Sequence, residues 1–171
     1  MLNNVYGNYA TNNGGGSYLN NSINTTIIGS VYGNSATNGG GVYLNNSKSN
    51  TISGSVYNNS ASAWGGGVYL ISSMYNTISG NVYGNSAAYG GGVSLVWGSV
   101  RNIISGSVYG NISRNSGGGV FLHNSDYFTN IGWITNNHAN TTGGGVYTNN
   151  PHPNSYFSVG RVINNIPNNF N

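Results

Sequence analysis

The stretch GNSATNGGGVYL, residues 33–44, places three consecutive glycines directly before a run of β-branched and aromatic residues that is typical of a β-strand. The triplet begins at residues 14, 39, 65, 90, 117 and 143, so its spacing is 25, 26, 25, 27 and 26 residues. One such turn alone would suit a phosphate, because its converging backbone N–H groups attract anions. Six copies in nearly constant phase indicate instead the recurring turn of a repeat protein.

One copy of the repeat, NTISGSVYNNSASAWGGGVYLISS at residues 50–73, contains three short extended segments, TIS, SVY and GVYL, separated by Gly, Asn and Ser. Three strands in about 26 residues predict one coil of a parallel β-helix, in which each strand pairs with its counterpart in the next coil. Because one coil cannot bury its own apolar face, stacking must supply the core. We therefore expect a single all-β domain over residues 1–171, a right-handed parallel β-helix (β-solenoid) with six to seven coils.

Aligning the copies gives columns of equivalent positions, and the residues in a column show which way it faces. One column holds only β-branched aliphatic residues and is expected inside: Val5, Val31, Val56, Val82, Val108, Ile134 and Val162. Two further columns lie two residues apart on the GVYL segment, which places both on one face of a strand. We expect these inside as well: Val42, Val68, Val93, Val120 and Val146, with Leu19, Leu44, Leu70, Leu95 and Leu122.

Two aromatic columns alternate with these inward positions and are expected to face solvent. The first lies between the inward valine and leucine and contains Tyr18, Tyr43, Tyr69, Phe121 and Tyr147, with Ser94 in one copy. The second follows the other inward valine and contains Tyr6, Tyr32, Tyr57, Tyr83 and Tyr109. We interpret both as surface ladders that serve assembly or carbohydrate contact, the alternative being in-register stacking that only stabilises the strands.

An asparagine column is the most regular of all, since it is filled in every copy at the bend after the second strand. Its members are Asn8, Asn34, Asn59, Asn85, Asn111, Asn137 and Asn165. Asparagine tolerates the left-handed backbone of a bend, and stacked amides can hydrogen-bond along an axis. We expect a structural asparagine ladder inside the coil.

Charge is nearly absent: only 3% of the residues are Asp, Glu, Lys or Arg. The basic residues Lys48, Arg101, Arg114 and Arg161 are not neighbours in sequence, whereas nucleic-acid binding requires clustered cations. We therefore expect no nucleic-acid partner. No apolar run reaches the length of a membrane span, so we expect no membrane insertion. The chain has no cysteine, and MLNNVYGNYA lacks the features of a secretory signal.

Catalysis by a pair of carboxylates is not available within one chain, because the chain contains one Asp and no Glu. Polysaccharide-cleaving enzymes need paired carboxylates or acidic calcium ligands, so we expect no enzyme, no cofactor and no metal. His123 and Asp126 lie close together in HNSDYF, while His138 and His152 lie elsewhere. A metal pair or a hydrolytic triad is the alternative to our interpretation that these are solvated loop histidines.

Six sequons give possible glycosylation sites: Asn20, Asn24, Asn45, Asn58, Asn111 and Asn140. Asparagine is so abundant here that several sequons arise by chance. A broken threonine column, Thr26, Thr51, Thr77 and Thr129 with Ile103 in the gap, is the only feature that favours ice binding.

The motif GNSAxxGGGVYL resembles the NNSA…GGAIY repeats of microbial surface adhesin-like parallel β-helix proteins. The pairing of Val-x-x-Asn with Gly-Gly-x-Val is similar to the Phe-x-x-Asn and Gly-Gly-Ala-Ile motifs of polymorphic outer membrane proteins, although valine here replaces phenylalanine and a third glycine replaces alanine. The resemblance covers nearly the whole chain. It implies a β-helix and an extracellular or cell-surface location.

The ends of the repeat suggest self-association, because a solenoid without caps exposes unpaired backbone groups. The chain enters the repeat at NNVYGN and stops at VINNIPNNFN, with no evident cap, although Pro167 and the divergent last copy could act as a modest stopper. We expect a non-catalytic extracellular structural solenoid that assembles end to end into a filament or surface fibre. The alternative is an adhesin-type domain that binds surface polysaccharide through its tyrosine ladders. Ice binding and polysaccharide degradation are less favoured.

Overall fold

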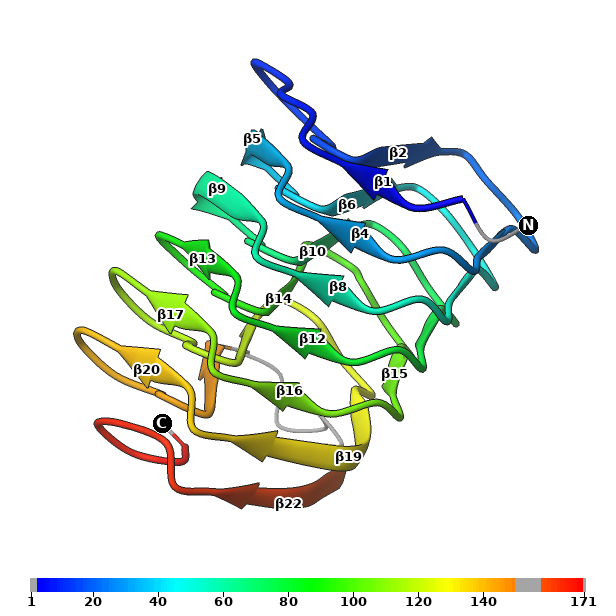
Figure 1. Cartoon of the computed structure of the whole chain (residues 1–171). Helices are drawn as coiled ribbons and strands as arrows, with labels where there is room; N and C mark the ends of the chain where they lie inside the picture. The colour runs from blue at the N-terminus through cyan, green and yellow to red at the C-terminus, as the bar shows by residue number, and fades with distance from the viewer. Residues whose placement is uncertain (1–2, 150–157, 171) are drawn as a thin grey trace.

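A computed structural model describes residues 3–149 and 158–170, which form a β-solenoid of stacked coils (Figure 1). Every strand pairing in this part of the chain is parallel, and the partners belong to successive coils, as in Val31↔Val56 or Val68↔Val93. None of the described residues belongs to a helix long and apolar enough to cross a membrane. The predicted all-β solenoid with three strand regions per coil is confirmed.

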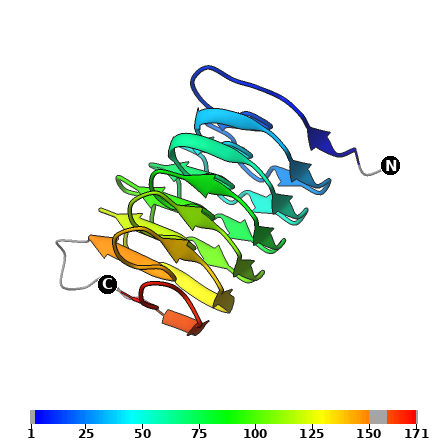
Figure 2. The same cartoon turned by 60° about the vertical axis from the view of Figure 1, so that its left-hand side comes forward.

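Three sheets form the walls of the solenoid and run along its axis (Figure 2). Sheet C contains one strand from each of six coils: β2 (Ser17–Asn20), β6 (Val42–Asn45), β10 (Val68–Ile71), β14 (Val93–Val96), β18 (Val120–His123) and β21 (Val146–Asn149). Sheet B contains β5 (Ser35–Asn38), β9 (Ser60–Trp64), β13 (Ser86–Ala87), β17 (Ile112–Ser113) and β20 (His138–Ala139).

Sheet A is the widest wall and is divided in the first coils into two rows of short strands. One row contains β1 (Val5–Tyr6), β4 (Val31–Tyr32), β8 (Val56–Tyr57), β12 (Val82–Tyr83) and β16 (Val108–Tyr109). The other contains β3 (Thr26–Ile27), β7 (Thr51–Ile52), β11 (Thr77–Ile78) and β15 (Ile103–Ile104). The longer strands β19 (Thr129–Thr135) and β22 (Ser158–Ile163) join the two rows at the C-terminal end.

The core is the lumen of the coil, and the predicted inward columns fill it. Val31, Val56, Val82 and Val108 are fully buried in one cluster with the valines and leucines of sheet C. Because strand side chains alternate between faces, each short strand contributes one or two apolar residues to this lumen. The second half of sheet A adds an isoleucine column: Ile27, Ile52, Ile78 and Ile104.

Each glycine of the triplet Gly39-Gly40-Gly41 is required for a different physical reason. Gly39 has φ of +61°, the left-handed region that favours glycine. A Cβ on Gly40 would collide with the carbonyl oxygen of Ser60 in the next coil. A Cβ on Gly41 would lie 2.6 Å from the Gly67 oxygen and 2.9 Å from Nδ2 of Asn59. The triplet therefore forms a corner where neighbouring coils approach closely.

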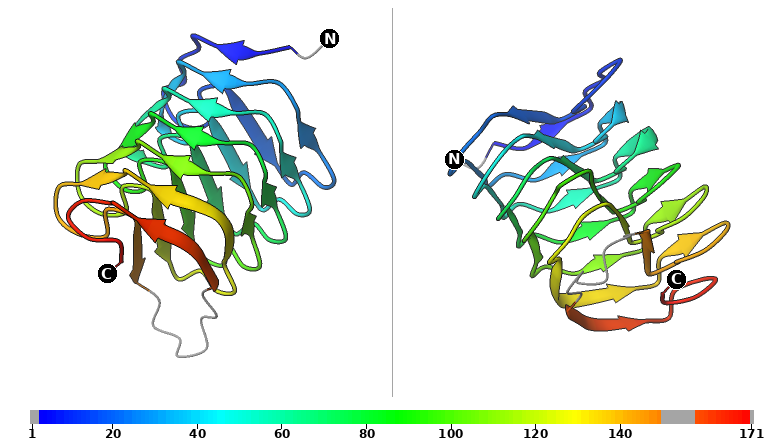
Figure 3. Two further views of the ribbon diagram at one scale, coloured as in Figure 1. Left: turned by 60° about the horizontal axis from the view of Figure 1, so that its bottom comes forward. Right: turned by 180° about the vertical axis from the view of Figure 1, so that it is seen from behind.

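The last turn, residues 164–170, folds back across the end of the preceding coil (Figure 3). Ile166 bridges to His138 and Phe170 bridges to Val146, so this turn reaches both sheet B and sheet C. Oδ1 of Asn169 accepts hydrogen bonds from the backbone N–H and the Nδ2 of Asn165, both at 3.1 Å. The expectation that no cap is present was wrong at this corner, because Asn169 ends the asparagine ladder.

Candidate functional site

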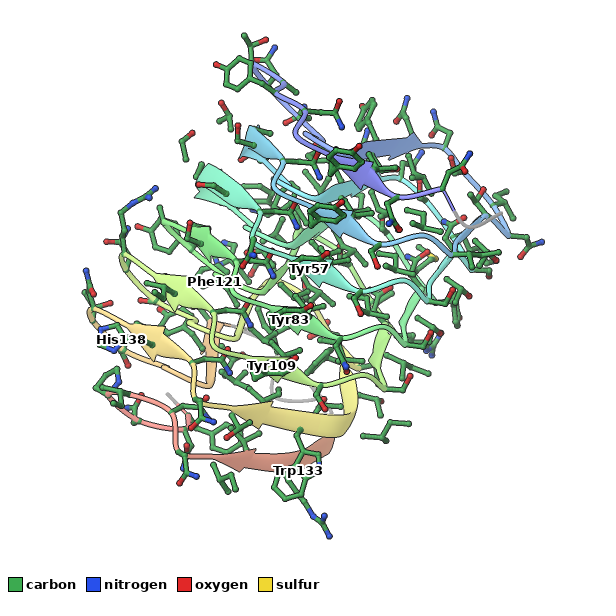
Figure 4. All side chains as sticks on the ribbon, in the orientation of Figure 1. Tyr57, Tyr83, Tyr109, Phe121, Trp133 and His138 are labelled. Atoms are coloured by element: carbon green, nitrogen blue, oxygen red, sulfur yellow. The ribbon has the colours of Figure 1, made fainter. Side chains whose placement is uncertain are left out.

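The column Tyr6, Tyr32, Tyr57, Tyr83 and Tyr109 lies on the outer face of sheet A, and we name it the tyrosine stack. Neighbouring ring centroids are 4.8–5.0 Å apart and the rings are within 3–6° of parallel. Figure 4 shows Tyr57, Tyr83 and Tyr109 one above another along the solenoid axis. Because each inner ring is covered on both faces by its neighbours, only ring edges and hydroxyls remain for a ligand. Carbohydrate contact on the stack, which the sequence analysis expected as one role, would therefore have to use ring edges and hydroxyls.

The column Tyr18, Tyr43, Tyr69, Ser94, Phe121 and Tyr147 lies on the outer face of sheet C, and we name it the covered column. Its side chains point away from the lumen, as predicted, but the prediction of an exposed ladder was wrong. Tyr43, Tyr69 and Phe121 are buried, and only Tyr18 is exposed. Together with Val96 they form a second apolar cluster outside the coil.

Ser94 shows why the sequence pattern was misleading. Serine in an aromatic column suggested an exposed place, yet Ser94 is 0% exposed and its Oγ donates to the carbonyl oxygen of Tyr89 at 3.0 Å. The ring of Trp64 contacts Tyr69 and Phe121, the neighbours of Ser94 in the column, at centroid distances of 6.0 and 6.3 Å. The small serine therefore leaves room for a tryptophan that comes from the end of β9.

A groove opens beside Trp64 over β18 and β21, with a volume of about 270 Å³, and we name it the aromatic groove. Its lining residues are Trp64, Tyr89, Ser116, Phe121, His123, Tyr147 and Asn149. Phe121 and Tyr147 are stacked at 5.0 Å and 9°, and Tyr89 is tilted against Phe121 at 5.3 Å. Trp97, which is 43% exposed, stacks on Trp64 at 4.7 Å just beside the lining.

Sequence reasoning missed this groove because its residues come from unrelated columns. Trp64 and Tyr89 take positions that hold Asn13 and Asn38 in earlier coils, and Trp97 follows the end of β14. The available signal was the placement of two tryptophans and a tyrosine within residues 64–97, where other copies have small polar residues. Only Phe121 and Tyr147 had been chosen from sequence.

Burial and neighbouring phenols raise the pKa of several ladder tyrosines. Burial is the main cause for Tyr43 and Tyr69, and the adjacent tyrosine of the preceding coil adds to it. In the tyrosine stack the pKa of Tyr83 is also raised, first by burial and then by Tyr109 and Tyr57. These hydroxyls stay protonated at neutral pH and act as neutral hydrogen-bonding groups.

The asparagine column forms a ladder inside the coil in which every hydrogen-bonding group of a central amide is used. The N–H and Nδ2 of Asn59 both donate to Oδ1 of Asn85, at 2.9 and 3.0 Å. Asn85 in turn donates from N–H and Nδ2 to Oδ1 of Asn111, and its Nδ2 also reaches the carbonyl oxygen of Val56. The arrangement has a structural role, because these buried amides are fully satisfied.

Two more polar ladders run through the core at another corner of the coil. The comparison of repeat copies in the sequence did not identify them. Asn50, Asn76 and Asn102 precede the TIS segment and repeat the amide pattern, with Phe128 in the next coil. The other is a serine ladder: Ser47, Ser73, Ser99 and Ser125 are buried, and the N–H of Ser47 donates to Oγ of Ser73 at 3.0 Å. The sequence signal for the second asparagine ladder was the asparagine that recurs directly before Thr-Ile.

The sequons divide by burial. Asn111 is 0% exposed and its Nδ2 is bonded within the asparagine ladder, so its proposed glycosylation is excluded in the folded chain. The side chain of Asn45 is half-buried and donates to Oδ1 of Asn20 at 2.8 Å. The other four, Asn20, Asn24, Asn58 and Asn140, are exposed.

His123 and His138 lie in separate places on the solenoid. The ring of His123 contacts Trp97 and Phe121, and its Nε2 is 3.3 Å from Nδ2 of Asn124. His138 is exposed on β20, and His152 falls outside the described residues. Residues 3–149 and 158–170 contain no group of three His, Cys, Asp or Glu side chains placed to hold a metal ion.

The basic residues are spread over the solenoid, and each contacts a neighbour in the chain. Arg101 lies over the rings of Tyr75 and Tyr127, at 5.6 and 5.1 Å, and donates to the Tyr75 hydroxyl at 2.7 Å. Nζ of Lys48 lies over the same Tyr75 ring, 5.4 Å from its centroid. Arg114 donates to the carbonyl oxygen of Ser62, and Arg161 lies over Trp133 at 4.6 Å.

One buried polar atom in the described part of the chain lacks a hydrogen-bond partner, Oδ1 of Asn130. Asn130 takes the place of isoleucine in the inward column of sheet A and donates from Nδ2 to the Gly132 carbonyl oxygen. The buried side chain of Asn130 faces the lumen of the solenoid and does not line the aromatic groove.

No protein-family model, no curated protein and no solved structure matches this chain.

Proposed function

We propose that the protein is a non-catalytic structural solenoid of the cell surface or extracellular space that associates end to end with further copies of itself. The observation that carries this proposal is a change of residue type along one outward column of sheet B. The residues in register are Tyr9, Ser35, Ser60, Ser86, Ile112, His138 and Ile166, so both end positions are apolar whereas three of the five positions between them are serine. Apolar side chains therefore lie at both positions where a further coil would stack, and Ile112 is the one apolar residue between them.

A second column repeats the pattern on sheet A. Ile28 in the first coil is followed in register by Ser53, Ser79 and Ser105, and the column then reaches Ile131. In the tyrosine stack column, the last position after Thr135 is Ile163, which is 41% exposed, and the first is Tyr6, which is 61% exposed. Apolar side chains thus lie at both ends of two columns, the sheet B column and the tyrosine stack column, and the Ile28 column turns apolar again one strand before the end of sheet A.

The exposure of these apolar side chains alone is weak support for association. Any end coil lacks one neighbouring coil, so all of its side chains are more exposed. The residue types at the two ends, Tyr9 and Ile166 in a column that holds mostly serine in between, do not follow from the missing neighbour. Large apolar groups are costly in water when nothing covers them, and exposed apolar patches mark interaction sites. In the proposed junction, Tyr6 and Tyr9 of one copy stack on Ile163 and Ile166 of another, as in-register residues do within the chain.

Backbone edges support the same contact. Within the described residues β22 pairs only with β19, and at the other end β1 pairs only with β4 and β3 only with β7. Charged residues that usually protect such edges are scarce in this chain. Asn169 already accepts the hydrogen bonds of Asn165, so the junction that we propose uses the sheet edges and apolar rows and does not continue the asparagine ladder.

The location rests on the sequence resemblance and on a surface whose polarity comes from neutral amides and hydroxyls instead of charges. The assignment as non-catalytic rests on the absence of any Glu and the presence of a single Asp in the sequence. Both assignments are part of the proposal.

Analytical ultracentrifugation and negative-stain electron microscopy of the purified chain test the association. We expect assembly that rises with protein concentration and gives rods of variable length. The double variant Tyr9→Ser/Ile166→Ser restores the serine of the central coils, so it should fold normally and shift the assembly toward monomer.

Ile112→Ser is the matched control, since Ile112 belongs to the same column, is 51% exposed and lies away from both ends. This variant should assemble like the unmodified chain. A wild-type chain that stays monomeric at high concentration, or equal assembly by the double variant, would refute the proposed function.

A further inference from the structure

We propose that the aromatic groove is a binding site for a neutral, β-1,4-linked oligosaccharide. The site is independent of the end-to-end association, because its lining lies on the outer face of sheet C and along the corner between sheets B and C. The proposal also differs from glycan binding along the length of a tyrosine ladder, because the groove uses only Phe121 and Tyr147 of the covered column and no residue of the tyrosine stack.

The groove offers open aromatic surface. Trp64, Tyr89 and Tyr147 are half-buried, in contrast to the buried Tyr43 and Tyr69 of the covered column. The rings meet at different angles, 57° between Tyr89 and Phe121 and 74° between Trp64 and Tyr89, so they form walls as well as a floor. Binding sites for small ligands combine such concave aromatic surface with a few polar groups.

Polar groups border the rings. The imidazole of His123, the amide of Asn149 and the hydroxyls of Tyr89 and Tyr147 belong to the lining, and Asn149 is exposed. Ser116 contributes a hydroxyl that is 2.9 Å from Oγ1 of Thr141. These groups donate and accept hydrogen bonds, which suits the hydroxyls of a sugar.

Charge selects the class of ligand. No Asp, Glu, Lys or Arg lines the groove, so an anionic glycan would lose hydration without gaining a counter-charge. A neutral pyranose has no such cost. Its equatorial β-1,4 linkages leave flat C–H faces for the rings and direct the hydroxyls outward to the polar border, where an apolar peptide would leave the border unpaired.

The three tryptophans allow ligand binding at the groove to be followed by fluorescence. Trp64 lines the groove and Trp97 stacks on it, whereas Trp133 lies on β19 under the guanidinium of Arg161 (Figure 4). Cellohexaose, chitohexaose and mannohexaose are titrated into the protein while tryptophan fluorescence and calorimetric heats are recorded. We expect saturable binding of at least one, and Trp133→Phe should retain the fluorescence change whereas Trp64→Phe should lose most of it.

Variants at the groove wall test the geometry with little risk to the fold. Tyr147→Ala and Asn149→Ala should each weaken binding by about tenfold, because both side chains are at least partly open to solvent and line the groove. Tyr57→Ala, in the middle of the tyrosine stack, is the matched control and should bind as the unmodified chain does. Thermal melting accompanies each variant so that loss of binding is separated from loss of structure.

Three results would each overturn the proposal. The first is absence of saturable binding by all three neutral hexasaccharides at millimolar concentration. The second is unchanged affinity in folded Tyr147→Ala and Asn149→Ala. The third is tighter binding of hexagalacturonate, the anionic counterpart, than of any neutral chain. A loss of binding in Tyr9→Ser/Ile166→Ser would show that the site depends on assembly, contrary to the independence claimed here.

Discussion

The rings of the tyrosine stack lie face to face over sheet A, whereas Tyr18, Tyr43 and Tyr69 of the covered column are tilted against one another over sheet C, and Tyr43 and Tyr69 are buried. Tyr57 and Tyr83 are 4° from parallel, while Tyr43 and Tyr69 are tilted by 42°. Both columns consist of aromatic residues that follow an inward valine. The difference arises from their surroundings, because small residues flank the first column and large ones flank the second.

The neighbours of each column explain this in detail. In sheet A, Ser55 lies two residues before Tyr57 on the same face, and Gly84 follows Tyr83 directly, so nothing large is available to cover the rings. Over sheet C, Trp64 and Tyr89 extend from the adjacent corner and pack on the column. The comparison teaches that alternation fixes the direction of a side chain, but residues elsewhere in the repeat decide whether it is exposed.

Truncating one ring in each column should give the largest difference between them. Tyr69→Ala removes a side chain that is 3% exposed, so it should lower the free energy of unfolding by about 3 kcal/mol. Tyr57→Ala removes a half-buried ring whose stacking contributes less, and about 1 kcal/mol is expected. Urea unfolding followed by circular dichroism measures both. Equal losses would show that the two columns do not differ in burial as described.

Placing tyrosine at the non-aromatic position of each column, Ser94 or Thr135, should change the free energy of unfolding by less, and with opposite signs in the two columns. Ser94→Tyr places a large ring where Trp64 already covers the position, so we expect a loss of about 1–3 kcal/mol from overpacking. Thr135→Tyr extends the tyrosine stack by one position next to Tyr109, at a half-buried site, and should be neutral or stabilising by about 0.5–1 kcal/mol.

Thermal unfolding measures the stability of Ser94→Tyr and Thr135→Tyr, and tryptophan fluorescence reports the environment of Trp64. Ser94→Tyr should also shift the emission of Trp64 to longer wavelength, because the displaced indole becomes more exposed. A well-tolerated Ser94→Tyr with unchanged emission would restore the original interpretation that position 94 is exposed.

Most of the fold was predictable because the repeat displays its own geometry. The glycine triplets set the period, and the inward valines and leucines identify the lumen. The asparagine ladder was predictable from one unbroken column, whereas the Asn50, Asn76 and Asn102 ladder was missed because Thr25 and Phe128 interrupt it. Columns therefore predict what every coil shares.

The aromatic groove could not be predicted in the same way, since it depends on departures from the repeat. Trp64 and Tyr89 are neighbours in one column that holds Asn13 and Asn38 in earlier coils, and Trp97 is a single aromatic exception in another column. Their rings meet only because Ser94 is small and the coils stack about 4.8 Å apart. Contacts between exceptions in different columns require coordinates, and the closure of the last turn by Asn169 is another case.

Alkaline pH should give the smallest effect. An ordinary tyrosine ionises near pH 10, and burial raises the pKa of Tyr69 and Tyr43 in the folded chain. Below pH 10 these phenols are protonated in both states, so their effect on stability is constant. As the pH rises above 10, the unfolded chain releases these protons while the folded chain retains them, and the free energy of unfolding falls.

Urea unfolding at pH 8, 10 and 11 measures that fall, and Tyr69→Phe removes one contributing phenol without removing the ring. The loss of stability between pH 8 and 11 should be smaller in Tyr69→Phe than in the unmodified chain. Tyr18→Phe, at the exposed end of the same column, is the control and should leave the dependence nearly unchanged. If the two variants behave alike, burial over sheet C is not what distinguishes the covered column, and the contrast with the tyrosine stack would have to rest on ring geometry alone.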